Sequence, residues 1–121
     1  MILVDTSVWI DHFRSCSLAL SEALERGEIL THPFVIGEIA CGNLRRRNEV
    51  LDLLFALPQS TMATDEEVLH FIGNHQLMGK GIGYVDGHLL AAAFLTGGAL
   101  LWTHDKSLLA AAVDLRLAFK P

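Results

Sequence analysis

Four acidic side chains lie along the chain at positions where carboxylates could do chemistry. Asp5 and Asp105 each follow the end of an apolar run, Asp86 begins an Ala- and Leu-rich stretch, and Glu38 lies among apolar residues. Carboxylate oxygens without Cys or paired His ligands favour Mg²⁺ or Mn²⁺ over Zn²⁺. If these acids meet in space, the sequence therefore predicts a site for one of these hard divalent cations.

Electrostatic repulsion limits how such a cluster can exist. Two carboxylates at close range repel by roughly 3 to 4 kcal/mol at an effective dielectric constant near 20. The summed repulsion of several such pairs is comparable to the free energy of unfolding of a whole domain, about 5 to 15 kcal/mol. Carboxylates that converge must therefore be partly protonated or hold a cation.

Taken singly, the acids also have ordinary structural explanations. Each of the three aspartates precedes or begins a predicted helix, and Asp is a preferred N-cap residue. Glu38 has apolar helical neighbours on every side and no Lys or Arg within one turn, which predicts a buried carboxylate. It would then need a cation or several donors, unless it is protonated and bonded to a backbone carbonyl.

The hydrophobic pattern places these acids on alternating strands and helices. Strands are predicted at residues 2–4, 28–31, 61–63, 99–103 and 116–119. Helices are predicted at residues 8–13, 17–26, from 33 onward, 45–57, 64–78, from about 84 to 96, and 106–113. This alternation, without internal repeats, predicts an α/β fold, a three-layer α/β/α sandwich on a parallel sheet.

The first apolar run has a special place in such a fold. Residues 2–4 leave no polar face for water, so this strand should lie in the middle of the sheet, covered on both sides. Asp5 then stands at its carboxyl end, where open α/β sheets bind ligands if the strand order reverses. This topology can bring all four acids to one edge of the sheet.

Composition limits the fold and the partners. With 121 residues, 51% of them hydrophobic, and a mean hydropathy of +0.38, residues 1–121 should form one domain with a large core. Part of the apolar surface could be covered by self-association. The net charge of −5 argues against coating nucleic acid by charge alone. It still permits a local basic patch beside an acidic site that cations neutralise.

The cysteines and the apolar stretches predict a soluble, cytoplasmic protein. Cys16 and Cys41 occur in apolar helical patterns without metal-ligand spacing, so we expect buried, reduced thiols. The longest apolar stretch, residues 89–102, is interrupted by Thr96, Gly97 and Gly98. We therefore expect no membrane span and no targeting segment.

Four sequence segments resemble a known family in their order along the chain. They are DTSVWID at the start, HPFVIGEIACGNL with its isolated Glu, GIGYVDGHLLAAA, and LLWTHDKSL. Together they resemble the PIN-domain ribonucleases, most closely the VapC-type toxins of bacterial toxin–antitoxin pairs, over nearly the whole chain. This resemblance implies that Asp5, Glu38, Asp86 and Asp105 form an acidic metal site on a five-stranded parallel sheet.

The resemblance also implies an activity and partners. The expected protein is an endoribonuclease that depends on Mg²⁺, with Mn²⁺ as the alternative, and hydrolyses RNA by metal-activated water. The products would carry 5′-phosphate and 3′-hydroxyl ends. The resemblance further implies a homodimer and inhibition by a cognate antitoxin protein.

Several other residues have two explanations each. Thr6 could support Asp5, and Thr103 lies in a Thr-x-Asp context similar to the family pattern, but both could be ordinary hydrogen-bonding residues at strand ends. His88 could face the substrate or the solvent. The basic run at residues 45–47 could be a solvated helix start or could contact RNA phosphates.

Two rival functions remain to be compared with the ribonuclease. A phosphotransferase of the haloacid dehalogenase type also places an Asp after its first strand, but it needs a second Asp two residues later, where this chain has Ser7. A catalytically silent PIN-like binding module is the rival from another class. The intact set of acids argues against it, and a metal-binding titration separates the two.

Overall fold

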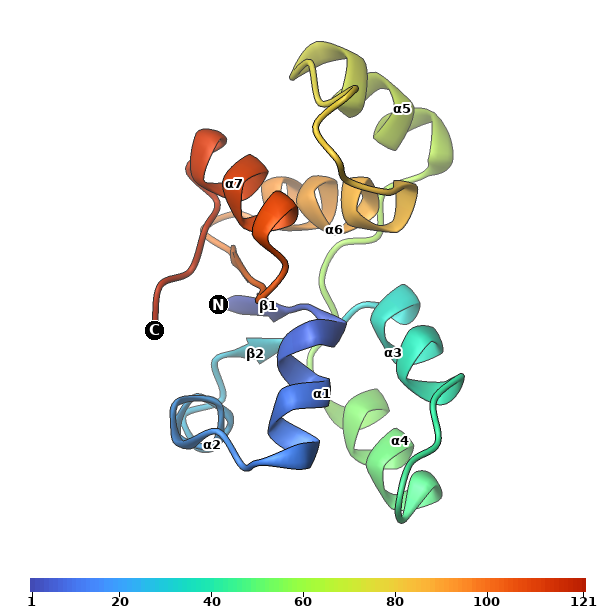
Figure 1. Cartoon of the computed structure of the whole chain (residues 1–121), viewed down its shortest axis with the longest axis vertical. Coiled ribbons are helices and arrows are strands. Elements are labelled where there is room, and N and C mark those ends of the chain that lie inside the picture. Colours follow the sequence, from blue (N-terminus) through green and yellow to red (C-terminus); the bar gives the residue numbers. More distant parts are fainter.

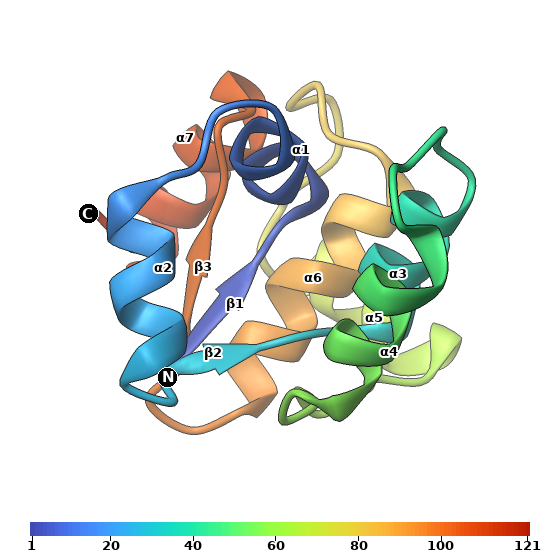
Figure 2. The same ribbon diagram turned by 90° about the horizontal axis from the view of Figure 1, so that it is seen from below.

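The computed structural model describes residues 1–121, and a parallel sheet lies at its centre. Strand β1 (Ile2–Val4) pairs in parallel with β2 (Ile29–Leu30) on one side and with β3 (Leu100–Trp102) on the other. Figure 2 shows β1 between its two neighbours. All residues of β1 are buried, which confirms the prediction of a central strand made from its wholly apolar sequence.

Helices cover both faces of the sheet. One side carries α1 (Thr6–Arg14), α2 (Leu18–Glu25), α3 (Pro33–Ala40) and α4 (Arg47–Ala56), and the other carries α5 (Asp65–Asn74), α6 (Tyr84–Leu95) and α7 (Lys106–Asp114) (Figure 1). The chain passes from β1 to β2 in one direction and later returns to β3 on the far side of β1. The order therefore reverses at β1, and Asp5 lies at this switch point.

The number of strands differs from the expectation of five. The sheet has three strands in the order β2-β1-β3, and each edge carries one further parallel bridge. Thr31 bridges to Gln59, two residues before the strand predicted at 61–63, and Leu101 bridges to Ala118. The prediction of a parallel sheet is confirmed, and the prediction of five extended strands is wrong.

Local chemistry explains why the edge at Thr31 stays short. Thr31 N–H donates to the carbonyl of Pro58 at 2.9 Å, and Ser60 N–H donates to the carbonyl of Thr31 at 2.9 Å. Pro58 has no N–H of its own, which is why proline is confined to edge strands and bulges. The backbone pairing at this edge is therefore limited to the two hydrogen bonds of Thr31 and does not extend into a longer strand.

Helix α6 is the buried helix of the fold. Seven consecutive residues, from Gly87 to Ala93, are buried in it. A helix that is apolar all round must be covered on all sides. At Gly87 an added Cβ would lie 3.1 Å from Cδ1 of Ile72, so the missing side chain lets α6 approach α5 closely. This packing fixes the start of α6, which carries Asp86.

Caps set the first turns of several helices. The sequence from Thr64 to Glu67 fits a capping box, and Thr64 and Glu67 form this box at the start of α5. His32 caps α3, because its Nδ1 accepts from the N–H of Phe34 at 3.0 Å. Burial, with the nearby His88 ring as a smaller cause, lowers the pKa of His32 to about 4. The ring is therefore neutral near pH 7 and keeps the lone pair that the cap requires.

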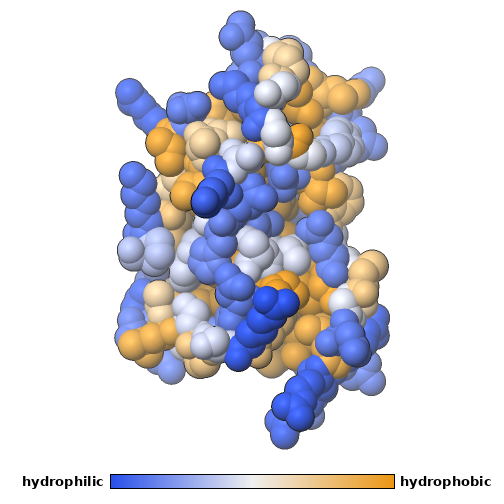
Figure 3. All heavy atoms as spheres, in the orientation of Figure 1, coloured by the Kyte–Doolittle hydropathy of each residue, from blue (hydrophilic) through white to orange (hydrophobic).

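The surface differs from two expectations. Cys16 and Cys41 are exposed free thiols and not buried ones, because Cys16 lies in the connection between α1 and α2 and Cys41 caps the end of α3. The helical spacing of Leu51, Leu54 and Phe55 predicts that they share one inward face of α4, but Phe55 is 65% exposed. Figure 3 shows apolar patches among the polar side chains of one face. No helix is both long and apolar enough to span a bilayer.

Candidate active site

Asp5 is the most firmly held of the four acids. The residue is 7% exposed, and Oδ2 accepts hydrogen bonds from the hydroxyls of Ser7 at 2.7 Å and Thr103 at 2.8 Å. Its N–H donates to the carbonyl of Trp102 at 2.9 Å, so β1 and β3 fix the backbone as well. Oδ1 accepts no hydrogen bond from the chain and remains available to a ligand. Thr103 thus takes the supporting position that the sequence suggested.

Ser7 is a supporting residue that the sequence reasoning missed. Its hydroxyl donates to Asp5, accepts from the N–H of His104 at 3.0 Å, and lies 3.3 Å from the hydroxyl of Thr103. It therefore joins the ends of β1 and β3. The only signal in the sequence was a short hydroxyl side chain two residues after Asp5.

Asp105 combines a structural role with a free oxygen. Its Oδ1 accepts from the N–H of Leu108 at 2.9 Å, which makes it the N-cap of α7. Its own N–H donates to the hydroxyl of Thr103 at 3.0 Å. Oδ2 accepts no hydrogen bond from the chain. The cap explanation and the ligand explanation are therefore compatible for this residue.

Glu38 is exposed, so the expectation of a buried carboxylate was wrong. The buried residues of α3 are Val35, Ile36 and Ile39. They form one stripe, and Glu38 lies outside it on the exposed side. Its Oε1 accepts from the hydroxyl of Thr6 at 2.7 Å. Thr6 thus supports Glu38 and not Asp5, which corrects its expected partner.

Asp86 shows that the four acids share one electrostatic site. Burial raises the pKa of Asp86, and the negative charges of Asp5, Asp105 and Glu38 raise it further, although a hydrogen bond from the N–H of Gly83 at 3.1 Å opposes them. None of the four carboxylates forms a salt bridge with Lys, Arg or His. The fold therefore brings these acids to one edge of the sheet without a compensating cationic side chain.

The donor set fits a hydrated cation better than an all-protein cage. No three His, Cys, Asp or Glu side chains are arranged closely enough to hold an ion by themselves. Mg²⁺ usually keeps several waters and takes only one or two carboxylates, with substrate phosphates completing its coordination. The free oxygens of Asp5 and Asp105 and the raised pKa of Asp86 suit such an ion, which would relieve the repulsion.

A second network holds the first turn of α6. Asp65 Oδ1 accepts from the hydroxyl of Tyr84 at 2.7 Å and lies 3.1 Å from Nε2 of His88. His88 is 1% exposed, and its ring centroid lies 4.6 Å from that of Phe34 on α3. The sequence had suggested that His88 faces either the substrate or the solvent, and its burial excludes both. The side chain instead joins α6 to α5 and α3 beside Asp86.

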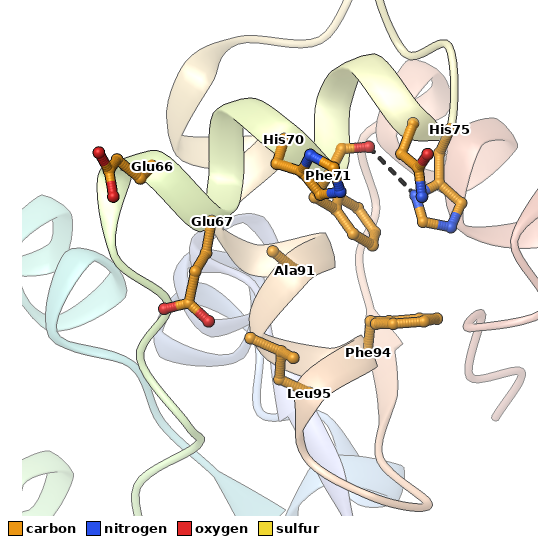
Figure 4. A pocket seen from close by; sticks show the side chains of 9 residues that line it. Glu66, Glu67, His70, Phe71, His75, Ala91, Phe94 and Leu95 are labelled. Atoms are coloured by element: carbon orange, nitrogen blue, oxygen red, sulfur yellow. Dashed lines mark hydrogen bonds between the residues drawn. The ribbon is translucent and has the colours of Figure 1, made fainter.

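A separate cavity lies between α5 and α6. It has a volume of about 400 Å³, and Figure 4 shows its lining with the rings of Phe71 and Phe94 near His75. The ring centroids of Phe71 and Phe94 are 5.3 Å apart. None of the four acids lines it, so this apolar cavity is not the candidate active site.

Comparison with known proteins settles the family. The model of the PIN domain matches residues 2–114. The chain belongs to the PIN-domain family. Its relatives include Ribonuclease VapC32 of Mycobacterium tuberculosis, in strains CDC 1551 / Oshkosh and H37Rv, which is 48% identical over 118 residues. That match covers 98% of this chain and 95% of the relative, so the expected likeness to VapC-type ribonucleases is confirmed.

Solved structures support the PIN fold at low sequence identity. The structure of VapBC-1 from nontypeable Haemophilus influenzae has a TM-score of 0.69 at 19% identity and covers 99% of this chain and 97% of that chain. PAE2754 from Pyrobaculum aerophilum has a TM-score of 0.60 at 18% identity, with coverage of 91% and 78%. These likenesses concern the fold, and the assignment of the four acids stays a prediction.

Proposed function

We propose that this PIN domain is a metal-dependent endoribonuclease that acts in the cytoplasm as the toxin of a toxin–antitoxin pair. One observation carries the proposal: the charges of Asp5, Asp105 and Glu38 act on Asp86, none of the four carboxylates has a cationic partner, and the chain is 48% identical to Ribonuclease VapC32. The hydrolase activity follows from the name of that relative, and the acidic edge supplies residues suited to it.

In the proposed site, Asp5, Glu38, Asp86 and Asp105 would together hold a hydrated Mg²⁺, with Mn²⁺ as the alternative, in part through the waters that the ion keeps. The bound cation would activate water and stabilise charge on the scissile phosphate. Ser7 and Thr103 hold the carboxylate of Asp5 in one orientation, and Thr6 does the same for Glu38. No side-chain nucleophile is required, so the protein contributes charge and position.

The structure weighs against the rival functions. A haloacid dehalogenase-type enzyme needs a second Asp at the position of Ser7, whose hydroxyl here supports Asp5. A silent binding module would keep four mutually repelling carboxylates without using them. The pKa of Asp86 is raised by burial and further by the other three carboxylates, and a bound cation would relieve the second of these causes.

We expect the purified protein to cut RNA only when a divalent cation is present. Incubation with total RNA and Mg²⁺ or Mn²⁺ should give products with 5′-phosphate and 3′-hydroxyl ends, and EDTA should stop the reaction. Sequencing the new RNA ends after a brief pulse of expression identifies the target in cells. RNA binding without metal binding or cleavage would support the silent module instead.

We further propose an antitoxin and a homodimer as partners. A groove of about 340 Å³, lined mainly by apolar residues of α1, α2 and α4, offers a surface for apolar side chains of an antitoxin segment. An Arg or Lys of that segment would pair with the four carboxylates and compete with the metal. Large exposed apolar side chains such as Leu69 and Phe94 support self-association.

The antitoxin should bind through both charge and apolar contact. An antitoxin encoded beside this gene should lose affinity as salt rises and when Asp5→Asn or Asp86→Asn removes a charge. A Leu53→Ser variant in the groove should instead weaken the part of the affinity that persists at high salt. Titration of the co-purified neighbour against RNA cleavage tests this. A neighbour that neither binds nor inhibits would remove the toxin assignment and leave the nuclease standing.

A further inference from the structure

Basic residues gather at one end of α1 and α3. Four of the nine Lys and Arg residues lie there, namely Arg14, Arg45, Arg46 and Arg47. Arg14 is the last residue of α1, where the helix dipole favours a cation. The other three lead from the end of α3 into α4. Two segments about thirty residues apart therefore bring positive charge together on a chain of net charge −5.

Arg14 and Arg45 line the same cavity of about 470 Å³. Its remaining lining is Ile10, Phe13, Gly42, Asn43 and Leu44, so no acidic side chain contributes to it. Neither arginine forms a salt bridge within the chain. Two guanidinium groups without counter-ions around one hollow are suited to an anionic ligand.

The other two arginines have structural partners. Arg47 donates from Nη2 to the carbonyl of Ala40 at 3.2 Å, which joins the start of α4 to the end of α3. Arg46 lies 4.0 Å from Glu49 and adopts a left-handed backbone with φ 52°. These contacts hold the connection between α3 and α4 in place. Arg45 is thereby left at the cavity without a partner of its own.

The two segments that line this cavity, the end of α1 and the residues after α3, are continuous with the helices that carry Thr6 and Glu38. Thr6 on α1 and Glu38 on α3 meet through their 2.7 Å hydrogen bond. Ile10 and Arg14 follow Thr6 at intervals of four residues, which places them on the same face of α1. Gly42 follows Glu38 by four residues and lies just beyond the end of α3. At 1.5 Å of rise per residue, Arg14 lies about 12 Å along α1 from Thr6.

We infer that the cavity between Arg14 and Arg45 binds a backbone phosphate of the RNA strand, a few nucleotides from the phosphate that is cut. This inference rests on the proposed nuclease function. A guanidinium fork can donate two parallel hydrogen bonds to phosphate oxygens, and the amide of Asn43 adds a further donor. The acidic centre repels RNA unless cations neutralise it, so a nearby cationic subsite would hold the strand in register.

Arg14→Ala and Arg45→Ala test the subsite through binding and salt dependence. Each variant should raise KM for a long single-stranded RNA by about tenfold and leave kcat nearly unchanged. In EDTA, where cleavage stops, the slope of log affinity against log salt should become shallower by ~0.7 for each phosphate that is no longer neutralised. Arg45→Lys keeps the charge and should restore the slope and only part of the affinity.

Arg26→Ala is the matched control, because it removes one positive charge just after the end of α2, where Arg26 contacts Glu22 and Glu28. It should leave KM and the salt slope at wild-type values. A dinucleotide substrate, too short to span about 12 Å, should be cut equally by wild type, Arg14→Ala and Arg45→Ala. Circular dichroism and thermal melting confirm that the variants fold.

Unchanged KM and salt slope in Arg14→Ala and Arg45→Ala, with active wild type, would overturn the subsite and leave the nuclease intact. Variants that bind RNA normally but lose antitoxin affinity would also overturn it, because the cavity would then serve an acidic peptide. Absence of cleavage by the wild type under every metal condition would instead remove the proposed function. The two failures are thus distinguishable.

Discussion

Asp5→Asn and Glu38→Gln should each lower the rate of RNA cleavage by at least ~100-fold while the chain stays folded. Changes in residues that only support metal ligands commonly cost ~10 to 100-fold in metal affinity or activity, so loss of a ligand charge should cost at least as much. Asn at position 5 keeps the volume of Asp, and its amide oxygen can still accept from Ser7 and Thr103. The expected loss therefore reports on charge and not on packing.

Neutral amide substitutions at Asp86 and Asp105 should lower the rate of RNA cleavage in the same way. Asp105→Asn should keep the cap of α7, because Asn is as good an N-cap residue as Asp. Asp86→Asn removes the carboxylate whose pKa the other three raise. Asp52→Asn on the exposed side of α4 is the control for loss of one negative charge. Wild-type cleavage rates in Asp5→Asn and Glu38→Gln would disprove the mechanism.

The parts of this site that the sequence predicted depend on local patterns. The apolar residues 2–4 required a central strand, and the structure places Asp5 at its carboxyl end. The capping box at Thr64 and the cap at Asp105 each need only a few consecutive residues, and both are present. Chemistry within one turn or one strand can be deduced without knowing the rest of the fold.

The parts that the sequence could not predict depend on distant neighbours. Ser7 and Thr103 are 96 positions apart, and they meet only because β1 pairs with β3. Glu38 was expected to be buried because its helical neighbours are apolar. The apolar residues of α3 form a stripe that packs against the core, and Glu38 lies outside this stripe. Whether a helical residue is buried depends on the face it occupies and not on the average composition of the helix. His88 is buried for a similar reason, since Asp65 and Phe34 come from other helices.

The second large effect should be stabilisation by the metal itself. Mg²⁺ or Mn²⁺ at a hundredfold excess over Kd should add about 2.7 kcal/mol to the free energy of unfolding. For a domain of this size, that corresponds to a rise in Tm of roughly 10 °C. The physical reason is the environment of Asp86, whose pKa is raised above its ordinary value of 3.8 mainly by burial and further by the charges of Asp5, Asp105 and Glu38. A cation among the carboxylates offsets the repulsion between these charges.

The pH dependence has a definite sign. Because the pKa of Asp86 is raised in the folded chain, its contribution to stability is fully present below pH 3.8 and is lost as pH rises through the folded pKa. Metal should restore this loss at neutral pH. Its stabilising effect should disappear in acid, where the protonated carboxylate no longer binds the ion.

Thermal melting of wild type and Asp86→Asn, in EDTA and in Mg²⁺, makes the comparison decisive. In EDTA the variant should be the more stable protein, because one repelling charge is gone. In Mg²⁺ the order should reverse, because only the wild type gains the full binding energy. NaCl at matched ionic strength controls for screening. An equal Tm for the wild type in EDTA and Mg²⁺, with no heat of binding at millimolar metal, would show that these carboxylates do not form a metal site.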